Sequence, residues 1–151
     1  MLSLTIEAFL VMFIEQSYNQ HMQIDDFLKS FILNAKSKAL ATYGPNGINV
    51  VPVSSIKILD NEIWLINYFM DKTLQNIKEN PEVSLVCWLD MMGFQIKGEI
   101  EYLENGDKFE KAVTWIKETL PERVVRGLLI LKPKEIFDVS PSKNTRDTYK
   151  P

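Results

Sequence analysis

The sequence predicts a small antiparallel β-barrel of six strands, closed or nearly closed, with two or three helices packed outside it, in the all-β/α+β class. Two observations predict this fold. Several stretches are apolar throughout or at every second residue and are separated by short turns, as in antiparallel strands. Other stretches repeat apolar residues at helical spacing. The length of 151 residues, 46% of them hydrophobic, suits one globular domain.

The first elements are a helix and a β-hairpin. Apolar residues at helical spacing predict a helix over 25–34. A strand over 37–43 follows, and the segment Gly44-Pro45-Asn46-Gly47 has the residues that a tight turn needs. A second strand, rich in Val and Ile, is expected over 48–59.

The middle of the chain completes a meander and adds a second helix. A tight turn at Asp60-Asn61 leads into a third strand over 62–67. A short helix over 72–80 then ends before a proline. The strand over 82–89 is apolar at almost every position, which predicts that both of its faces are buried.

The last part of the domain repeats this order. Alternating apolar and polar residues predict a half-buried strand over 94–102. Asp107 and Glu110 are expected to cap the start of the helix that follows, as an N-cap residue and its partner three positions on. The final strand or strands are expected over 126–131 and 136–139.

Charge and composition exclude several classes of function. The net charge is −3 and no more than two cations are adjacent, so nucleic-acid binding is not expected. Cys87 is the single cysteine and lies in an apolar run, which predicts a buried thiol and a reducing, cytoplasmic location. The single histidine, His21, is far from it, so neither a zinc site nor a Cys-His pair is expected.

The two ends of the chain differ from the predicted domain over 22–139. Residues 1–21 are interpreted as an extension, either an extra helix or sequence upstream of a natural start at Met22. Their apolar part contains an acidic residue and is too short to span a membrane. A signal peptide would require a positively charged start, but no Lys or Arg precedes Lys29. Residues 140–151 are expected to form a loose polar tail.

The segment 50–55, of sequence VVPVSS, is the first candidate site. Proline cannot donate to a β-ladder, so Pro52 predicts an edge strand or a bulge. The unpaired backbone groups of an edge strand can contact solvent or a ligand that carries its own donors and acceptors. A plain edge strand and a ligand-binding edge both remain open on this pattern.

The segment Asp71-Lys72-Thr73 is the second candidate. It opens a short helix, whose first N–H groups are free and carry partial positive charge. A lysine ammonium and a threonine hydroxyl added there would suit a phosphate group. The alternative is that Asp71 or Thr73 only caps the helix and that Lys72 is solvated.

These segments together resemble the pyridoxamine 5′-phosphate oxidase-like family of FMN-binding split barrels. The similarity is carried by the run NVVPVSSIKILDNEIWLINYFMDKTLQNIKENPEVSLVCW and by GFQIKGEIEY after it, and it extends over about residues 27–139. The resemblance implies a six-stranded split barrel and a homodimer with FMN bound at its interface. It also implies the cofactor-binding residues, which are Val51, Pro52, Val53, Ser54, Asn67, Phe69, Met70, Lys72, Thr73, Trp88 and Gln95.

Within that set the resemblance implies different roles. Residues 51–54 would line the flavin ring, Lys72 and Thr73 would hold the phosphate, and Trp88 and Gln95 could reach the flavin from the partner subunit. The C-terminal tail has Arg146 but no histidine, which departs from the true oxidases and argues against pyridoxamine 5′-phosphate as the substrate.

The resulting hypothesis is an FMN-dependent oxidoreductase that exchanges electrons with a small-molecule donor or acceptor. No side chain stands out as a catalytic acid or base. The alternatives are a module that binds FMN without turnover and a structural barrel without a cofactor. Haem or a deazaflavin in place of FMN is a further alternative.

Overall fold

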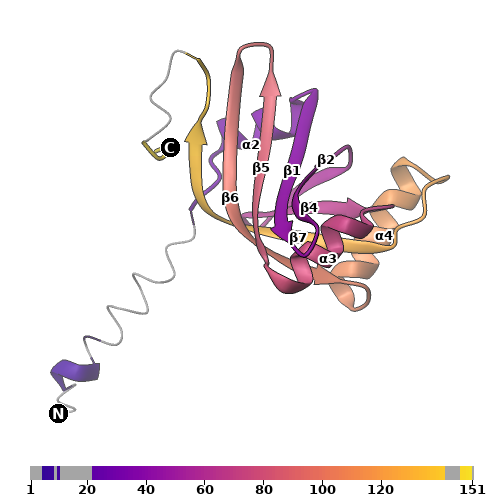
Figure 1. Cartoon of the computed structure of the whole chain (residues 1–151), viewed down its shortest axis with the longest axis horizontal. Coiled ribbons are helices and arrows are strands. Elements are labelled where there is room, and N and C mark those ends of the chain that lie inside the picture. The colour runs from indigo at the N-terminus through magenta and orange to yellow at the C-terminus, as the bar shows by residue number, and fades with distance from the viewer. Residues whose placement is uncertain (1–4, 9, 11–21, 142–146, 151) are drawn as a thin grey trace.

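Seven antiparallel strands form one open sheet in the computed structural model, which describes residues 5–8, 10, 22–141 and 147–150 (Figure 1). The strands are β1 (Ser37–Gly44), β2 (Gly47–Pro52), β3 (Ile56–Leu59), β4 (Glu62–Asn67), β5 (Glu82–Leu89), β6 (Met92–Leu103) and β7 (Gly127–Asp138). Their order in the sheet is β2-β1-β5-β6-β7-β4-β3. The helices α2 (Asp26–Asn34), α3 (Asp71–Glu79) and α4 (Asp107–Thr119) pack on it, and residues 6–8 are also helical.

The prediction of six strands is wrong, and the sheet does not close into a barrel. The expected strand over 48–59 is two strands, β2 and β3, and these lie at opposite edges of the sheet. Pro52 ends β2 because it has no N–H to continue the ladder. Only residues 53–55 join the two edges, so the sheet curves back on itself and remains open at this link.

The two longest strands, β6 and β7, connect the halves of the sheet. The predicted segments 126–131 and 136–139 form the single strand β7, which pairs with β4 near its start and with β6 along its length (Figure 1). The β6–β7 register shifts between Lys97 and Gly98, opposite Pro133. A bulge at a proline bends the strand there and increases its local twist.

The sheet is buried on both faces where β4 and β7 pair. One face packs on α2 and the other packs on α4, so both strands are apolar at consecutive positions. The first cluster includes Leu28 of α2 with Leu65 and Leu129, and the second includes Ile116 of α4 with Ile66 and Leu128.

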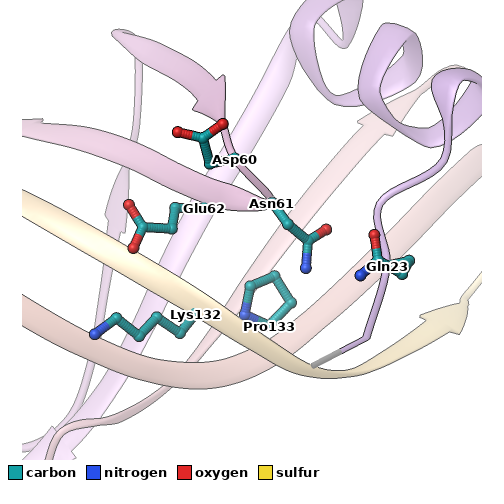
Figure 2. A pocket seen from close by; sticks show the side chains of 6 residues that line it. All are labelled: Gln23, Asp60, Asn61, Glu62, Lys132 and Pro133. Carbon is teal, nitrogen blue, oxygen red and sulfur yellow. The ribbon is translucent and has the colours of Figure 1, made fainter. Parts of the chain in front are cut away.

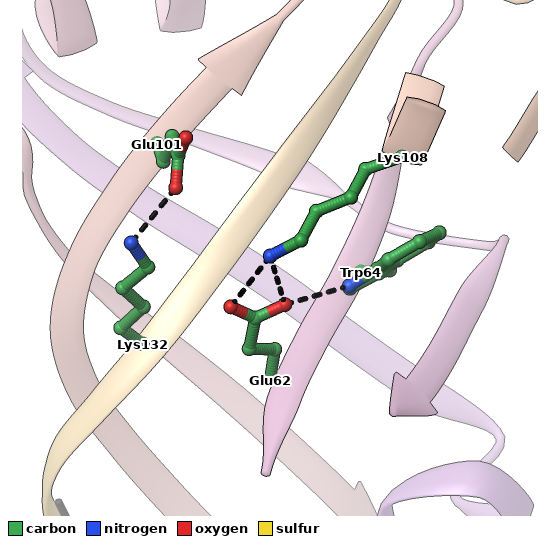
Figure 3. Close-up of polar contacts among 5 residues, drawn as sticks. All are labelled: Glu62, Trp64, Glu101, Lys108 and Lys132. Atoms are coloured by element: carbon green, nitrogen blue, oxygen red, sulfur yellow. Dashed lines mark hydrogen bonds and ion pairs between the residues drawn. The ribbon is translucent and has the colours of Figure 1, made fainter. Parts of the chain in front are cut away.

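Polar contacts at the helix ends fix α2 and α4. The Asp25 carboxylate accepts from the Leu28 N–H at 2.7 Å, so Asp25 is the N-cap of α2. The predicted capping role of Asp107 is wrong, because Gly106 is the N-cap of α4 and no side chain caps that helix. Lys108 of α4 instead donates to both Glu62 oxygens at 2.9 Å, beside the indole N–H of Trp64 (Figure 3).

Among the residues that the structure describes, none covers the outer face of β5. Val83, Leu85 and Cys87 are buried on the core side, whereas Ser84 and Val86 are half-buried and Trp88 is 41% exposed. Within the described part of the chain, the expectation that both faces of 82–89 are buried is therefore wrong. Burial raises the pKa of the Cys87 thiol to about 12, which keeps it protonated and unreactive.

The described end of the C-terminal tail packs on the domain. Thr148 forms a bridge with Phe137, and the Tyr149 hydroxyl donates to Asp25 at 2.8 Å. The Tyr149 ring also meets Phe94 edge-on, with ring centroids 5.4 Å apart. Arg146, His21 and most of the extension over 1–21 lie outside the described residues. None of the helices among the described residues has the length and hydropathy needed to cross a membrane.

Candidate functional site

Helix α3 is held against the β1–β2 hairpin by a buried side-chain amide. Asn76 is fully buried, and its amide donates to Thr42 Oγ1 at 3.2 Å and to the Gly47 carbonyl at 3.1 Å. Its side-chain oxygen accepts from the Asn46 N–H at 3.0 Å. Gly44 allows this approach, because a Cβ there would lie 2.8 Å from Asn76 Cα. These contacts fix where the N-terminus of α3 lies.

The first turn of α3 carries Lys72 and Thr73. Met70 is the N-cap residue and makes no side-chain capping bond, so the first N–H groups of the helix have no side-chain partner. Lys72 is exposed at this end. Thr73 is buried, and its hydroxyl accepts from the Asn49 amide at 2.9 Å, so it ties α3 to β2. Neither Asp71 nor Thr73 is the N-cap that the simpler interpretation expected.

Asn67 organises the segment between β4 and α3. It is 3% exposed, its side-chain oxygen accepts from the Met70 N–H at 2.8 Å, and its amide donates to the Tyr102 hydroxyl at 3.0 Å. Burial raises the pKa of that phenol, which therefore remains neutral. Met70 packs against the core and Phe69 is 74% exposed. Asn67, Phe69 and Met70 thus lie together next to Lys72.

The predicted edge over 51–54 is at the margin of the sheet, since β2 is an edge strand. The Val53 N–H donates to the Lys38 carbonyl at 3.0 Å, so the Val53 amide is paired with β1. Antiparallel pairing alternates, so Val51 also directs its backbone toward β1 while the Pro52 carbonyl points to the free margin. Val53 is buried, and Pro52 and Ser54 are exposed.

Trp88 and Gln95 are not brought to α3 within one chain. The register places one residue from each of four strands in a single row across the uncovered face: Pro52, Ala39, Val86 and Gln95. Three strand spacings separate the ends of this row by about 14 Å. The Gln95 amide donates to Ser84 at 2.9 Å, and Trp88 lies further along β5.

Arg123 and Arg126 lie near this site and were not selected from the sequence, whereas Ser55 belongs to the candidate segment 50–55. Ser55 is buried and shares a 2.8 Å hydrogen bond with the Tyr68 hydroxyl, which fixes the β2–β3 link to the end of β4. Arg126 lies over the Phe69 ring at 4.3 Å from its centroid, and Arg123 lies 5.4 Å from that of Tyr68. In the sequence, the only indication of a role for these arginines is that both lie in the short run ERVVRG directly before the last strand.

A surface hollow of about 420 Å³ lies away from these residues and is lined by Gln23, Asp60, Asn61, Glu62, Lys132 and Pro133 (Figure 2). Asn61 there accepts from the Ile24 N–H at 2.6 Å and donates to the Met22 carbonyl at 2.7 Å, so this seam attaches residues 22–24 to the β3–β4 turn. Within the described ranges, no group of three His, Cys, Asp or Glu residues could hold a metal ion.

The sequence of this chain is similar to one described protein family and to a protein from an archaeal species. The sequence profile described as pyridoxamine 5′-phosphate oxidase matches residues 24–144, which is most of the chain. An uncharacterised protein of Methanocaldococcus jannaschii is 34% identical over 105 residues, which cover 66% of this chain and 70% of that protein.

Solved structures agree with this result at the level of the fold. HupZ of Group A Streptococcus is 21% identical with a TM-score of 0.72, and the match covers 81% of this chain and 98% of HupZ. An FMN-binding protein of Syntrophomonas wolfei is also 21% identical, with a TM-score of 0.68 and coverage of 89% and 99%.

Proposed function

The chain belongs to the pyridoxamine 5′-phosphate oxidase family, and on this premise we propose that it is a cytoplasmic, homodimeric, FMN-dependent oxidoreductase. The observation that carries the proposal is the uncapped N-terminus of α3, which presents Lys72 beside Asn67 and is fixed in place by the buried Asn76. The FMN-binding protein of similar fold supports the choice of cofactor.

The phosphate of FMN would bind at the first turn of α3. Free N–H groups and the helix dipole favour an anion there, and the Lys72 ammonium adds a full positive charge. The Thr73 hydroxyl accepts from Asn49 and keeps its own proton available for a phosphate oxygen. Thr73 would thus both anchor the helix and contact the ligand.

The ring of FMN would lie along the free margin of β2. The Pro52 carbonyl and the backbone of Ser54 offer an acceptor and a donor beyond the β1 pairing. Val51 and Val53 would supply apolar contact below the ring, and Phe69 and Met70 would flank the ribityl chain. FMN would supply the hydride or electron transfer, while these residues bind and orient it.

A homodimer would cover the exposed outer face of the sheet. Tyr43, Ile48 and Val50 of the β1–β2 hairpin are more than half exposed and lie beside the outer residues of β5. A contiguous apolar patch of this kind is typical of a protein interface. Pairing across this patch would bring Trp88 and Gln95 of each subunit toward the partner. These two residues are far from α3 of their own chain, so they would contact a flavin only across the dimer interface.

We expect Lys72→Ala to weaken FMN binding by about 10- to 100-fold, because it removes a charge-assisted contact to phosphate. The measurement is an equilibrium titration of FMN fluorescence with the full chain. Lys78→Ala is the matched control, since Lys78 is exposed near the other end of the same helix. Equal FMN affinities for wild type and Lys72→Ala would mean that the phosphate of FMN does not bind at the start of α3.

The dimer is tested by its mass. Light scattering should give twice the 17.5 kDa of the chain for the wild type, and Val86→Glu should shift it to the monomer by placing a charge in the middle of the interface. Val124→Glu makes the same change at a residue that is 76% exposed away from this face, and it should remain a dimer. A monomeric wild type would contradict the interface.

Turnover distinguishes the oxidoreductase from a module that only binds FMN. Flavin bound to the protein should lose its visible absorption when a dihydronicotinamide is added without oxygen, and it should recover when an acceptor is added. A bound flavin that no donor reduces would support the binding module. A haem or deazaflavin would be recognised by its own absorption spectrum after reconstitution.

A further inference from the structure

Two arginines in the segment 121–126, between α4 and β7, lie over aromatic rings at the end of β4. The Arg126 guanidinium is 4.3 Å from the Phe69 ring centroid, and that of Arg123 is 5.4 Å from the Tyr68 ring. Both arginines are exposed, and so is Phe69. Two consecutive aromatic residues thus carry one cation each.

Stacking leaves the hydrogen-bonding groups of Arg126 available, whereas the Arg123 guanidinium lies 4.0 Å from the Glu122 carboxylate. A guanidinium contacts a ring with its face, while its five N–H groups lie in the plane and can bind a phosphate or carboxylate in a bidentate manner. Among the described residues, no carboxylate lies within 4.0 Å of Arg126, whereas Lys108 and Lys132 are paired with glutamates (Figure 3). Arg126 is therefore an oriented cation in a chain whose net charge is −3.

The backbone ties Arg126 to the start of α3. Its N–H donates to the Asn67 carbonyl at 2.9 Å, and the Asn67 side chain accepts from the Met70 N–H at 2.8 Å. Met70 is the N-cap of α3, so a single buried residue links Arg126 to the proposed phosphate site. Gly127 follows directly and packs against Tyr102, which also contacts Asn67.

We propose that Arg126, assisted by Arg123, binds the anionic group of the small molecule that exchanges electrons with the flavin. The substrate class is a phosphate-bearing redox molecule, for which NADPH and NADP⁺ are suitable probes. The phosphate of FMN is already accounted for at α3, so this second positive site serves a second anion. The inference rests on the proposed FMN function and adds the class of its substrate.

The test compares Arg126→Gln with wild type, both loaded with FMN. Calorimetric binding of NADP⁺, which involves no turnover, should weaken by about tenfold in Arg126→Gln, because a charge-assisted pair is lost. The KM for NADPH should rise similarly, while the KM for the uncharged donor N-benzyl-1,4-dihydronicotinamide should not change. Lys57→Gln is the matched control, because it also removes a cation that lies over an aromatic ring. The Lys57 ammonium of β3 is 5.2 Å from the ring centroid of Trp115 in α4.

Two results would overturn the proposal. Arg126→Gln could leave NADP⁺ binding and both KM values unchanged, in which case the arginine has no substrate role. It could instead weaken FMN binding as much as Lys72→Ala while NADP⁺ binding stays the same, which would assign Arg126 to the cofactor phosphate. A chain that retains no FMN would fail in the separate FMN titration, so failure of the proposed function is recognised independently.

Discussion

Replacing Asn76 with leucine is expected to lower the free energy of unfolding by about 2–4 kcal/mol, because the hydrogen bonds of a buried amide are lost. Leucine has a similar size, so packing changes little, but the Gly47 carbonyl, the Asn46 N–H and the Thr42 hydroxyl lose their partner. Urea unfolding followed by circular dichroism measures the change. FMN affinity should fall as well, since α3 loses its attachment to the hairpin.

Gln75→Leu is the matched control for this prediction. Gln75 carries the same amide on the same helix and also contacts Asn46, at 2.8 Å, but it is exposed. Its substitution should change stability by about 0.5 kcal/mol or less. Similar losses for Gln75→Leu and Asn76→Leu would mean that burial of the Asn76 network does not hold α3 in place.

The second large effect is expected for Gly98→Ala, at about 3 kcal/mol of lost stability. A Cβ at Gly98 would overlap the Lys132 carbonyl oxygen and lie 2.9 Å from its carbonyl carbon. The neighbour is backbone of the paired strand at the β6–β7 bulge, so relief requires the two longest strands to separate. Thermal unfolding in the same buffer measures this loss.

Gly93→Ala provides the comparison on the same strand. The nearest atoms to a Cβ there are Trp88 Cβ and Val139 Cγ2, both at 3.3 Å, so the neighbours need to move by only a few tenths of an ångström. We expect a smaller loss, about 1 kcal/mol. If alanine is tolerated equally at both glycines, the bulge does not depend on the close approach of β6 to β7.

Local pattern was sufficient where the evidence for an element lies within the element. The strands predicted over 62–67 and 82–89 have these bounds in the structure as β4 and β5, and the helix over 72–80 is shifted by one residue in α3. The turn at Asp60-Asn61 is confirmed by positive φ angles at both residues, of 49° and 63°. Each of these depends on short-range chemistry, such as a following proline or a pair of turn residues.

The pairing of distant segments could not be obtained in this way. The segment 48–59 contains no local signal that its first part pairs with β1 and its second part with β4. That choice depends on residues outside the segment. The prediction that both faces of β5 are buried was wrong for the same reason. An apolar strand indicates that its faces favour burial, but not whether the same chain or another molecule covers them.

The candidate site shows the same division. Lys72 and Pro52 could be selected from helix-start and edge-strand chemistry. Arg126 joins Phe69 and Asn67 through a tertiary contact between residues nearly sixty positions apart in sequence, and no local pattern encodes such a contact. Asn76 likewise reads as an ordinary polar residue of a helix until the hairpin is placed over it.

The most direct test of the account is the visible absorption spectrum of the full chain after FMN has been added and the excess removed by gel filtration. The account predicts that the bands of oxidised flavin stay with the protein, at one FMN per chain, in a peak with the mass of a dimer. A colourless protein that retains no added FMN would contradict the central claim.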